Sequence, residues 1–523
     1  MSGIQDVRSK DVPSKSHNLH HFDEPVAQLR SLGRTKGSNP ALAAKLLSII
    51  SPQNTFQRGT PGYEVARSAY WNKTQAEATP LCIYQPRTAG EVSLVLVILR
   101  YTWCPFAVKA GGHGKFNGES SINDGVLIDL AQLNHIIVAE DHTTVAVGPG
   151  NRWSSVYAAI EPLGITVVGG RAASVGVGGF LLGGGISWYS NLYGWGSDNI
   201  RSYQVVLGDG TIVTASTDSY PDLYKALRGG AGNFGIVTSF NLEARPYTGM
   251  WGGEISWDYS QSKAVQQAFL RTGAISDSAD RKSFFILALT SNPEKEWIWG
   301  SAMYYCDAVK DPQPFHEALQ IPAVENTCAV LPQTEHVTKM SAAYPHYLQH
   351  TFWVIATKVD PTILRFCADT WTTELQPILD TVEGFKGQLA IQYITAGVIE
   401  GAARNGGNTL GLAGTEPFIM LNAEPSWNKK SDNHRVFAAI DRAFRNMVAE
   451  AKRTGQYHEY LYSNYASEYQ HPIGSYGEEA RGFMQQVASK YDPDRVFQDL
   501  RGAGFKLAGA PKSLRSVHET PKL

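Results

Sequence analysis

The chain has 523 residues, of which 43% are hydrophobic and 18% are charged, and its formal net charge at pH 7 is -2. A chain of this size can bury more than one hydrophobic core, and its balanced charge argues against nucleic acid or an acidic membrane surface as a partner. Five cysteines without paired metal-ligand spacing argue against a metal site and favour reduced thiols: Cys82, Cys104, Cys306, Cys328 and Cys367.

Both ends of the chain bear on where the protein is located. Residues 1–22 are polar and have no apolar core of a signal peptide, and no segment reaches the roughly 18 uninterrupted apolar residues of a membrane span. We therefore expect a cytoplasmic protein with an unused glycosylation sequon at Asn72. The last residues, Pro521-Lys522-Leu523, differ from the Ser-Lys-Leu peroxisomal signal only at the first position, which leaves a peroxisomal location open.

The first predicted elements follow a polar N-terminal extension, residues 1–62, in which only Ala41 to Ile50 is apolar. We expect this extension to wrap loosely on the surface and the ordered fold to begin near Tyr63. Thr88-Ala89-Gly90-Glu91 has the pattern of a capping box and precedes the apolar run Val92 to Tyr101. This combination predicts a helix packed on a sheet.

Helices and strands then alternate, which predicts a mixed α/β region up to about Tyr247. Apolar residues fall on one face of Asn151 to Gly164, so this segment is predicted as a helix that ends at its glycine. The Asp209-Gly210 pair within residues 204–213 predicts the turn of a β-hairpin.

Two glycine-rich segments interrupt this pattern. Lys109-Ala110-Gly111-Gly112-His113-Gly114 places a histidine on a nearly bare backbone, and residues 169–185 carry eight glycines in seventeen residues. Glycines let an anionic ligand approach the main chain, whose N–H groups can bind it. The nicotinamide-type fingerprint Gly-x-Gly-x-x-Gly fails, because its third glycine would fall on Leu181, and the Walker A pattern is absent.

Five ordered motifs carry a family resemblance: AGGHGKFNG at 110–118, ASVGVGGFLLGGG at 173–185, YGWGSDNI at 193–200, LRGGAGNFGIVTSF at 227–240 and YLYSNYASEY at 460–469. The first two resemble the FAD-binding domain of the vanillyl-alcohol-oxidase (PCMH-type) superfamily. With the other three, the chain resembles the berberine-bridge-enzyme-like branch of FAD-linked oxidoreductases, over about residues 65 to 510.

The resemblance implies an α+β fold with a two-subdomain PCMH-type FAD-binding domain at 63–247. A substrate domain at 248–455 should follow, built as an antiparallel sheet backed by helices. Strand-like runs at Ser283–Leu289 and Ile298–Tyr305, and an apolar helix face in Ser431–Arg453, agree with this expectation. Residues 456–510 should return to the FAD-binding domain.

The resemblance also implies how the cofactor is held. His113 should be bonded covalently to the 8α-methyl group of FAD, and Ala172 stands where relatives add a cysteine link, so a single covalent bond is expected. Val175 should lie near flavin C4a, where a valine resembles the oxygen-admitting version, and Lys109 stands where relatives often have arginine. The residues expected to hold FAD are Lys109, Ala110, Gly111, Gly112, His113, Gly114, Asn117, Ser174, Val175, Gly176, Gly178, Gly179, Ser197, Asn199, Gly232, Ile236 and Asn464.

Within that set, Ser197, Asn199, Gly232 and Ile236 are expected at the adenine and ribose end. For Ser197 and Asn199, the capping of a turn is an equally good interpretation.

Tyr462-Ser463-Asn464-Tyr465 matches the Tyr-x-Asn-Tyr tail of the family. Oxidation of an alcohol needs a base within hydrogen-bonding reach of the substrate hydroxyl. A free phenol has a pKa near 10, so a tyrosine base needs a positive neighbour or a coupled acceptor. We expect Tyr465 as the base and Tyr462 as the second choice, with Asn464 contacting the flavin. If the two tyrosines only pack, the base lies elsewhere.

Candidate substrate contacts come from strand-like segments of the second domain: Gln392, Tyr393, Asn422 and Glu424. Ordinary polarity of a sheet surface is an alternative reading of these four side chains.

The expected function is that of an oxidase. Hydride would pass from a small-molecule alcohol or specialised-metabolite intermediate to FAD, which O₂ would reoxidise with release of H₂O₂. Three alternatives stay open: a dehydrogenase with another electron acceptor, a cyclisation catalyst or binding protein that uses the flavin as a scaffold, and a glycine-rich domain without flavin.

Overall fold

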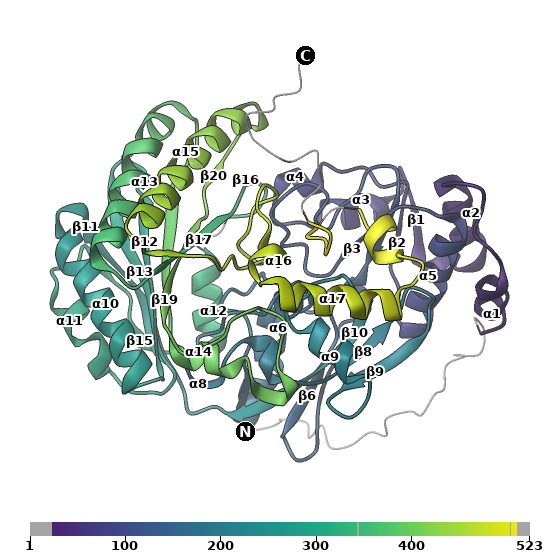
Figure 1. Ribbon diagram of the computed structural model, residues 1–523, viewed down its shortest axis with the longest axis horizontal. Coiled ribbons are helices and arrows are strands. Elements are labelled where there is room, and N and C mark those ends of the chain that lie inside the picture. Colours follow the sequence, from purple (N-terminus) through teal and green to yellow (C-terminus); the bar gives the residue numbers. More distant parts are fainter. Residues whose placement is uncertain (1–22, 343–344, 503, 510–523) are drawn as a thin grey trace, which may run out of the picture.

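The computed structural model describes residues 23–342, 345–502 and 504–509. Predictions about the first 22 residues and the C-terminal tripeptide fall outside these ranges. The fold has two lobes: one contains two small sheets, and the other contains a large sheet whose outer side is covered by helices (Figure 1).

The first lobe joins two sheets through a buried helix. One sheet contains β1 (Thr55–Gln57), β2 (Cys82–Tyr84), β4 (Val126–Asp129) and β3 (Phe106–Lys109), in that order, with β2, β4 and β3 parallel. The other is antiparallel, in the order β5 (Ile136–Val138), β6 (Thr144–Val147), β10 (Ile236–Pro246), β8 (Ile200–Val206) and β9 (Ile212–Ser216), with β7 (Ile165–Val167) paired to β10. Helix α5 (Ala89–Thr102) packs between the sheets, in one core with β3, β4 and residues of β8 and β10.

Local sequence signals set the ends of these elements, as predicted. The Thr88 hydroxyl accepts a hydrogen bond from the backbone N–H of Glu91 at the start of α5, at 3.2 Å. Helix α6 (Trp153–Ile160) continues as a short 3₁₀ turn that ends at Gly164, whose φ of 68° suits glycine. Strands β8 and β9 form the predicted hairpin, and Gly210 in its turn has a φ of 82°.

The prediction of a loose N-terminal extension is wrong for residues 23–62. Helices α1 (Asp23–Ser31) and α2 (Pro40–Ile50) both pack against α5, and Asn39 caps α2. The apolar patch noted in the sequence is one face of α2, on which Ala43 and Leu47 are completely buried. An amphipathic helix gains more by burying such a face than by leaving it in water.

The second lobe is a nine-stranded sheet in which every pair of strands is antiparallel. Its order is β14 (Glu325–Asn326), β11 (Trp251–Asp258), β13 (Trp297–Tyr305), β12 (Ser283–Ser291), β18 (Gln388–Ile394), β19 (Phe418–Ala423), β17 (Trp353–Lys358) and β21 (Tyr457–His458), with β15 (Ala329–Val330) beside β11. Helices α10 (Ser262–Ser278), α13 (Pro361–Thr381) and α15 (Asn433–Arg453) cover its outer side (Figure 1).

Residues of this sheet alternate strictly between two cores. Leu289, Ile391 and Leu421 face the helices, whereas Phe284 and Met420 belong to the core that is shared with the first lobe. The first lobe therefore packs against the inner face of this sheet.

Short elements complete the fold. The helices are α3 (Pro61–Ser68), α4 (Lys73–Ala76), α7 (Val177–Leu182), α8 (Ser190–Tyr193), α9 (Pro221–Leu227), α11 (His316–Gln320), α12 (Gln333–Ala342), α14 (Ala396–Gly401), α16 (Pro472–Ser475) and α17 (Glu478–Tyr491). Strands β16 (Gln349–His350) and β20 (Ser426–Trp427) form a separate pair.

The C-terminal segment lies against the first lobe. Helix α17 contacts α9, Phe497 packs edge-on against Phe106 of β3, and the backbone N–H of Gly502 donates to the carbonyl of Phe106 at 2.8 Å. Strands β10 and β11, on either side of residue 247, lie in different sheets. The domain limits themselves stay predictions.

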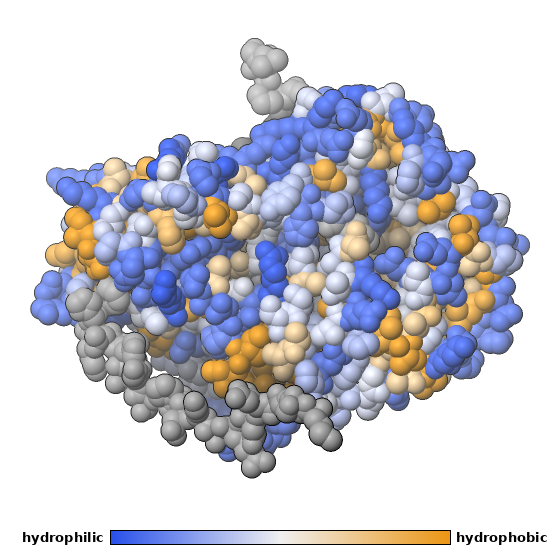
Figure 2. Space-filling model, turned by 180° about the vertical axis from the view of Figure 1, so that it is seen from behind, coloured by the Kyte–Doolittle hydropathy of each residue, from blue (hydrophilic) through white to orange (hydrophobic). Residues whose placement is uncertain are grey.

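The surface in Figure 2 is mostly hydrophilic, and its apolar residues lie in small separate groups. Within the described ranges, no helix is both long and apolar enough to cross a membrane, and no group of three or more His, Cys, Asp or Glu side chains is placed to hold a metal ion. All five cysteines are free thiols.

Docking of α2 is tested by a pair of substitutions on one helix. Leu47→Ala should lower the free energy of unfolding by about 2–5 kcal/mol, because it opens a cavity at a completely buried side chain. The control is Ile49→Ala, since that side chain is 66% exposed and should change stability by about 0.5 kcal/mol or less. Urea unfolding measures both, and equal effects would contradict a docked α2.

Candidate active site

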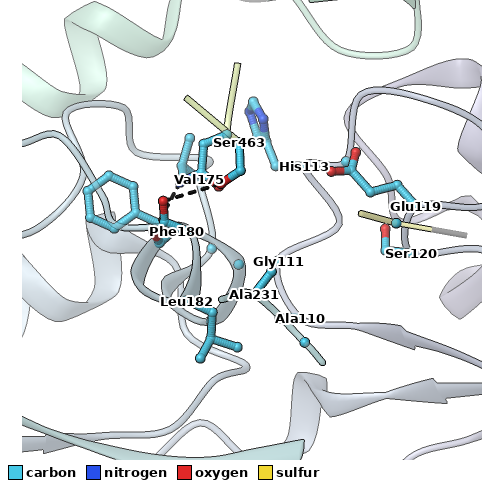
Figure 3. A pocket seen from close by; sticks show the side chains of 18 of the residues that line it. Ala110, Gly111, His113, Glu119, Ser120, Val175, Phe180, Leu182, Ala231 and Ser463 are labelled. Atoms are coloured by element: carbon cyan, nitrogen blue, oxygen red, sulfur yellow. Dashed lines mark hydrogen bonds between the residues drawn. The ribbon is translucent and has the colours of Figure 1, made fainter. Parts of the chain in front are cut away.

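A cavity of about 320 Å³ is lined by both lobes and by the C-terminal segment. This volume lies within the range of ligand sites. The first lobe contributes the loop after β3 and the glycine-rich loop around α7, the second lobe contributes Met340, Phe352 and Glu424, and the tail contributes residues 462–465. Figure 3 shows part of this lining, with the His113 side chain standing clear of the Gly111 backbone.

The two glycine-rich loops cross in direct backbone contact. A Cβ atom on Gly111 would lie 2.3 Å from the Cα of Gly176, and a Cβ on Gly176 would lie 2.4 Å from the Cα of Gly111. These two glycines therefore allow one loop to touch the other.

Gly179 differs from this pair. It lines the cavity, and a Cβ atom there would meet nothing within 4 Å. Its missing side chain leaves space for a ligand.

His113 lies at one end of a stack of three rings. Its imidazole stacks on Trp71 with 4.3 Å between ring centroids, and Trp71 stacks on His350 from the other side at 3.8 Å. The Ser174 hydroxyl lies 3.3 Å from His113 Nε2. Burial, with the positive charge of Arg152 as a lesser cause, lowers the pKa of His113 to about 3, so the ring is neutral near pH 7 and keeps a free lone pair.

Asn72, beside this stack, joins the two lobes. Its Nδ2 donates to the carbonyls of Lys115, at 2.7 Å, and His350, at 3.0 Å. The side chain is completely buried, so the folded protein cannot carry a glycan at this nitrogen.

The two candidate tyrosines have different surroundings. The Tyr462 oxygen accepts from the backbone N–H of Gly185, at 2.8 Å, and from Asn464 Nδ2, at 2.9 Å, and burial raises the pKa of Tyr462 well above its ordinary value. The Tyr465 oxygen accepts from Arg171, at 2.5 Å, and from Gln392 Nε2, at 3.2 Å. Of the two tyrosines, Tyr465 is the one that accepts a hydrogen bond from a cation, which is the kind of neighbour a tyrosine base requires.

Sequence reasoning missed Arg171, although a signal was present. Arg171 is the only charged residue within the glycine-rich stretch 169–185. Trp71 and Arg501 were also missed, and no local pattern distinguishes them.

Several predicted cofactor residues do line the cavity: Ala110, Gly111, Gly112, His113, Gly114, Val175, Gly176, Gly178, Gly179, Gly232, Ile236 and Asn464. Ser174 reaches the site through its contact with His113.

Four other predicted residues do not line it. Lys109 is buried in an ion pair with Asp129, at 3.1 Å, so its charge is used inside the first lobe. Asn117 is exposed at the surface. Ser197 is completely buried, and Asn199 donates to the carbonyls of Tyr193 and Trp195, both at 2.9 Å, which is the turn-capping alternative.

The four predicted substrate contacts separate according to strand alternation. Gln392 points inward to Arg171 and Tyr465, and Glu424 lines the cavity. Asn422 is completely buried and donates to the Glu424 carboxylate at 2.5 Å, so it positions that side chain. Tyr393 faces the outer helices and packs on Gly273, so its assignment to the substrate site is wrong.

The far end of the cavity suits the phosphates and adenosine of a dinucleotide. Arg501 lines it beside Gly232, and its Nε atom is buried without a hydrogen-bond partner. Burial lowers the pKa of Arg501 to about 10, so its charge persists near pH 7. The backbone of Arg501 forms an isolated parallel β-bridge with Phe106 at the start of β3, whereas His113 follows the end of that strand. A buried cation at one end and a neutral histidine at the other fit an elongated anionic cofactor.

Comparison with known proteins agrees with this geometry. The family described as "FAD binding domain" matches residues 80–216. A FAD-dependent monooxygenase of Cochliobolus heterostrophus is 33% identical over 474 residues, which is 88% of this chain and 91% of the relative. A FAD-dependent monooxygenase of Penicillium terrestre is 32% identical, over 92% of this chain and 93% of the relative.

The chain belongs to the family of FAD-linked oxidoreductases that contains these two relatives. Solved structures share the fold of this oxidoreductase at low sequence identity. Berberine bridge enzyme superposes with a TM-score of 0.70 at 14% identity, covering 90% of this chain and 100% of that one. The 6-hydroxy-D-nicotine oxidase of Arthrobacter nicotinovorans gives 0.69 at 18% identity, covering 86% and 97%. The oxidoreductase therefore binds FAD and has the expected α+β fold.

The two kinds of glycine in this oxidoreductase should respond differently to alanine. Gly111→Ala should cost about 3 kcal/mol or more, because its Cβ meets backbone atoms that cannot move aside. Gly179→Ala should fold with unchanged or slightly higher stability, since alanine favours helix α7, but should lose FAD. Thermal unfolding and the flavin absorbance per polypeptide measure these effects, and full FAD content in Gly179→Ala would contradict the assignment.

Proposed function

We propose that this oxidoreductase is an oxidase that converts a small-molecule alcohol to a carbonyl compound. The observation that carries the proposal is Tyr465, whose oxygen lies in the FAD cavity within hydrogen-bonding distance of Arg171 and Gln392. Such an oxygen is arranged to accept the proton of a substrate hydroxyl.

The overall reaction is R₂CH–OH + O₂ → R₂C=O + H₂O₂. FAD, when bound, would supply the two-electron chemistry, as the acceptor of the substrate hydride and the donor of two electrons to O₂. Tyr465 takes the hydroxyl proton while the C–H bond breaks. Glu424 and Gln392 orient the substrate on the inner face of the second lobe, and Asn464 contacts the flavin.

We propose that His113 carries FAD through one covalent bond to the 8α-methyl group. Its neutral imidazole and its fixed stack on Trp71 support this role. Ala172 has only a methyl group, so a second link at that position is chemically impossible. Val175 lines the cavity, and we assign it the role of leaving room for oxygen beside the flavin.

A second candidate function comes from the two relatives described above, both of which are named FAD-dependent monooxygenases. A monooxygenase places one atom of O₂ in the product and reduces the other to water with two further electrons. An oxidase places no atom of O₂ in the product, and a dehydrogenase does not consume O₂ at all. Turnover under oxygen-18 gas, followed by mass spectrometry of the product and assay of H₂O₂, distinguishes the three.

Covalent attachment is tested by acid precipitation. The wild-type polypeptide should keep its yellow colour in the precipitate, whereas His113→Ala should release its flavin into the supernatant. The control is His142→Ala, because His142 lies in the exposed turn before β6, and this variant should keep the colour. Release of all flavin from the wild type would contradict the link.

Tyr465→Phe tests the base. Anaerobic mixing with alcohols and metabolite precursors first identifies a substrate that bleaches the flavin. The rate of bleaching in Tyr465→Phe should then fall about 10²-fold or more, because the proton acceptor is gone. Tyr220→Phe is the matched control, since Tyr220 is 41% exposed and does not line the cavity, so this variant should bleach at the wild-type rate. An unchanged rate in Tyr465→Phe would exclude this base and favour a scaffold or binding role.

A further inference from the structure

We propose that Arg171 is a positioning residue that places a positive charge against the Tyr465 oxygen and thereby supports this oxygen as the proton acceptor. The inference rests on the proposed oxidase function, for which Tyr465 is the base. It adds a residue of the glycine-rich loop whose role in the reaction is purely electrostatic.

The geometry around Tyr465 is a closed ring of three side chains. One guanidinium nitrogen of Arg171 donates to the Tyr465 oxygen at 2.5 Å, and the other donates to Gln392 Oε1 at 2.8 Å. Gln392 Nε2 completes the ring by donating to the Tyr465 oxygen at 3.2 Å. An oxygen that accepts two hydrogen bonds, one of them from a cation, is stabilised most when it carries negative charge.

The charge of Arg171 is not neutralised by another protein group. Its guanidinium lies over the ring of Phe284, 5.1 Å from the centroid, and the polar contacts that the described residues make with it are those to Gln392 and Tyr465, neither of which is a carboxylate. Its positive charge is therefore directed at Tyr465, in surroundings that screen it less than bulk water would.

Tyr462 provides an internal comparison. The two phenol rings meet edge to face, with 4.9 Å between centroids, and each oxygen accepts two hydrogen bonds. Both donors to Tyr462 are neutral, and burial raises its pKa. The two phenols therefore differ in their donors, because only the Tyr465 oxygen accepts a hydrogen bond from the Arg171 cation.

The other titratable groups around this ring do not replace Arg171. His113 and Tyr462 line the same cavity, and their pKa shifts keep both neutral near pH 7. Lys115 also lines it, but its ammonium is paired with Glu119 at 2.9 Å. Glu424 is the remaining carboxyl group in the lining. Burial raises the pKa of both Tyr157 and Tyr304, which lie near Arg171.

The pH dependence of flavin bleaching tests the proposal in the holoenzyme. The base must be deprotonated to react, so the rate rises with pH through its titration. Arg171→Met should move this rise to higher pH by about one unit or more. The bleaching rate of the variant should therefore be about 10-fold or more below the wild-type rate near pH 7, and the two rates should become equal in alkaline buffer. Arg171→Lys keeps the charge but not the two-pronged geometry and should give a smaller shift.

A second readout does not need turnover. Fluorotyrosine placed at position 465 reports its own ionisation through its fluorine NMR shift, and the titration should move to higher pH in Arg171→Met. This measurement separates failure of the proposal from failure of the proposed function, because the fluorine titration can be recorded even if no alcohol bleaches the flavin. Arg271→Met is the control, since Arg271 is 68% exposed on α10 and should move neither curve.

Either of two results would overturn the proposal. One is a fluorine titration that is identical with and without Arg171. The other is a higher KM in Arg171→Met while its bleaching rate rises over the same pH range as in the wild type. That result would mean that Arg171 binds an anionic group of the substrate.

Discussion

The site depends on one backbone contact, the crossing of Gly111 over Gly176. These residues come from two loops that follow different sheets of the first lobe, and no side chain separates them. The contact brings His113 to Ser174 and sets Val175 and Gly179 along the same cavity. If either glycine carried a Cβ atom, the loops would separate and the histidine would no longer face the space where the flavin belongs.

Residues distant in the sequence complete the cavity that the two loops line in part. The second lobe supplies Gln392 and Glu424 from the inner face of its sheet, and the tail supplies Tyr462 and Tyr465. Strand alternation decides which residues take part, so Gln392 reaches the cavity while its neighbour Tyr393 packs among helices. The first lobe contributes both glycine-rich loops of the cavity, and the other segments contribute the polar side chains Gln392, Glu424 and Tyr465 beside them.

Local patterns in the sequence predicted the parts of this structure that local forces determine. The cap at Thr88, the hairpin at Asp209-Gly210 and the glycine-rich loops each depend on neighbouring residues, and each was found. Arg171 was not, because its role arises only when the chain brings it to Gln392, 221 positions away. Lys109 was misassigned for the same reason, since its partner Asp129 lies on the neighbouring strand β4.

The ring stack at His113 has a consequence for how the enzyme matures. Its outer member, His350, comes from a strand pair of the second lobe, so Trp71, the ring that supports the imidazole, gains its second stacking partner only when both lobes have come together. If His113 carries the proposed bond to FAD, docking of the second lobe would therefore support the residue that forms it. Chains that bind FAD but whose halves fail to dock would give up their colour on denaturation, even with every residue of the first lobe intact.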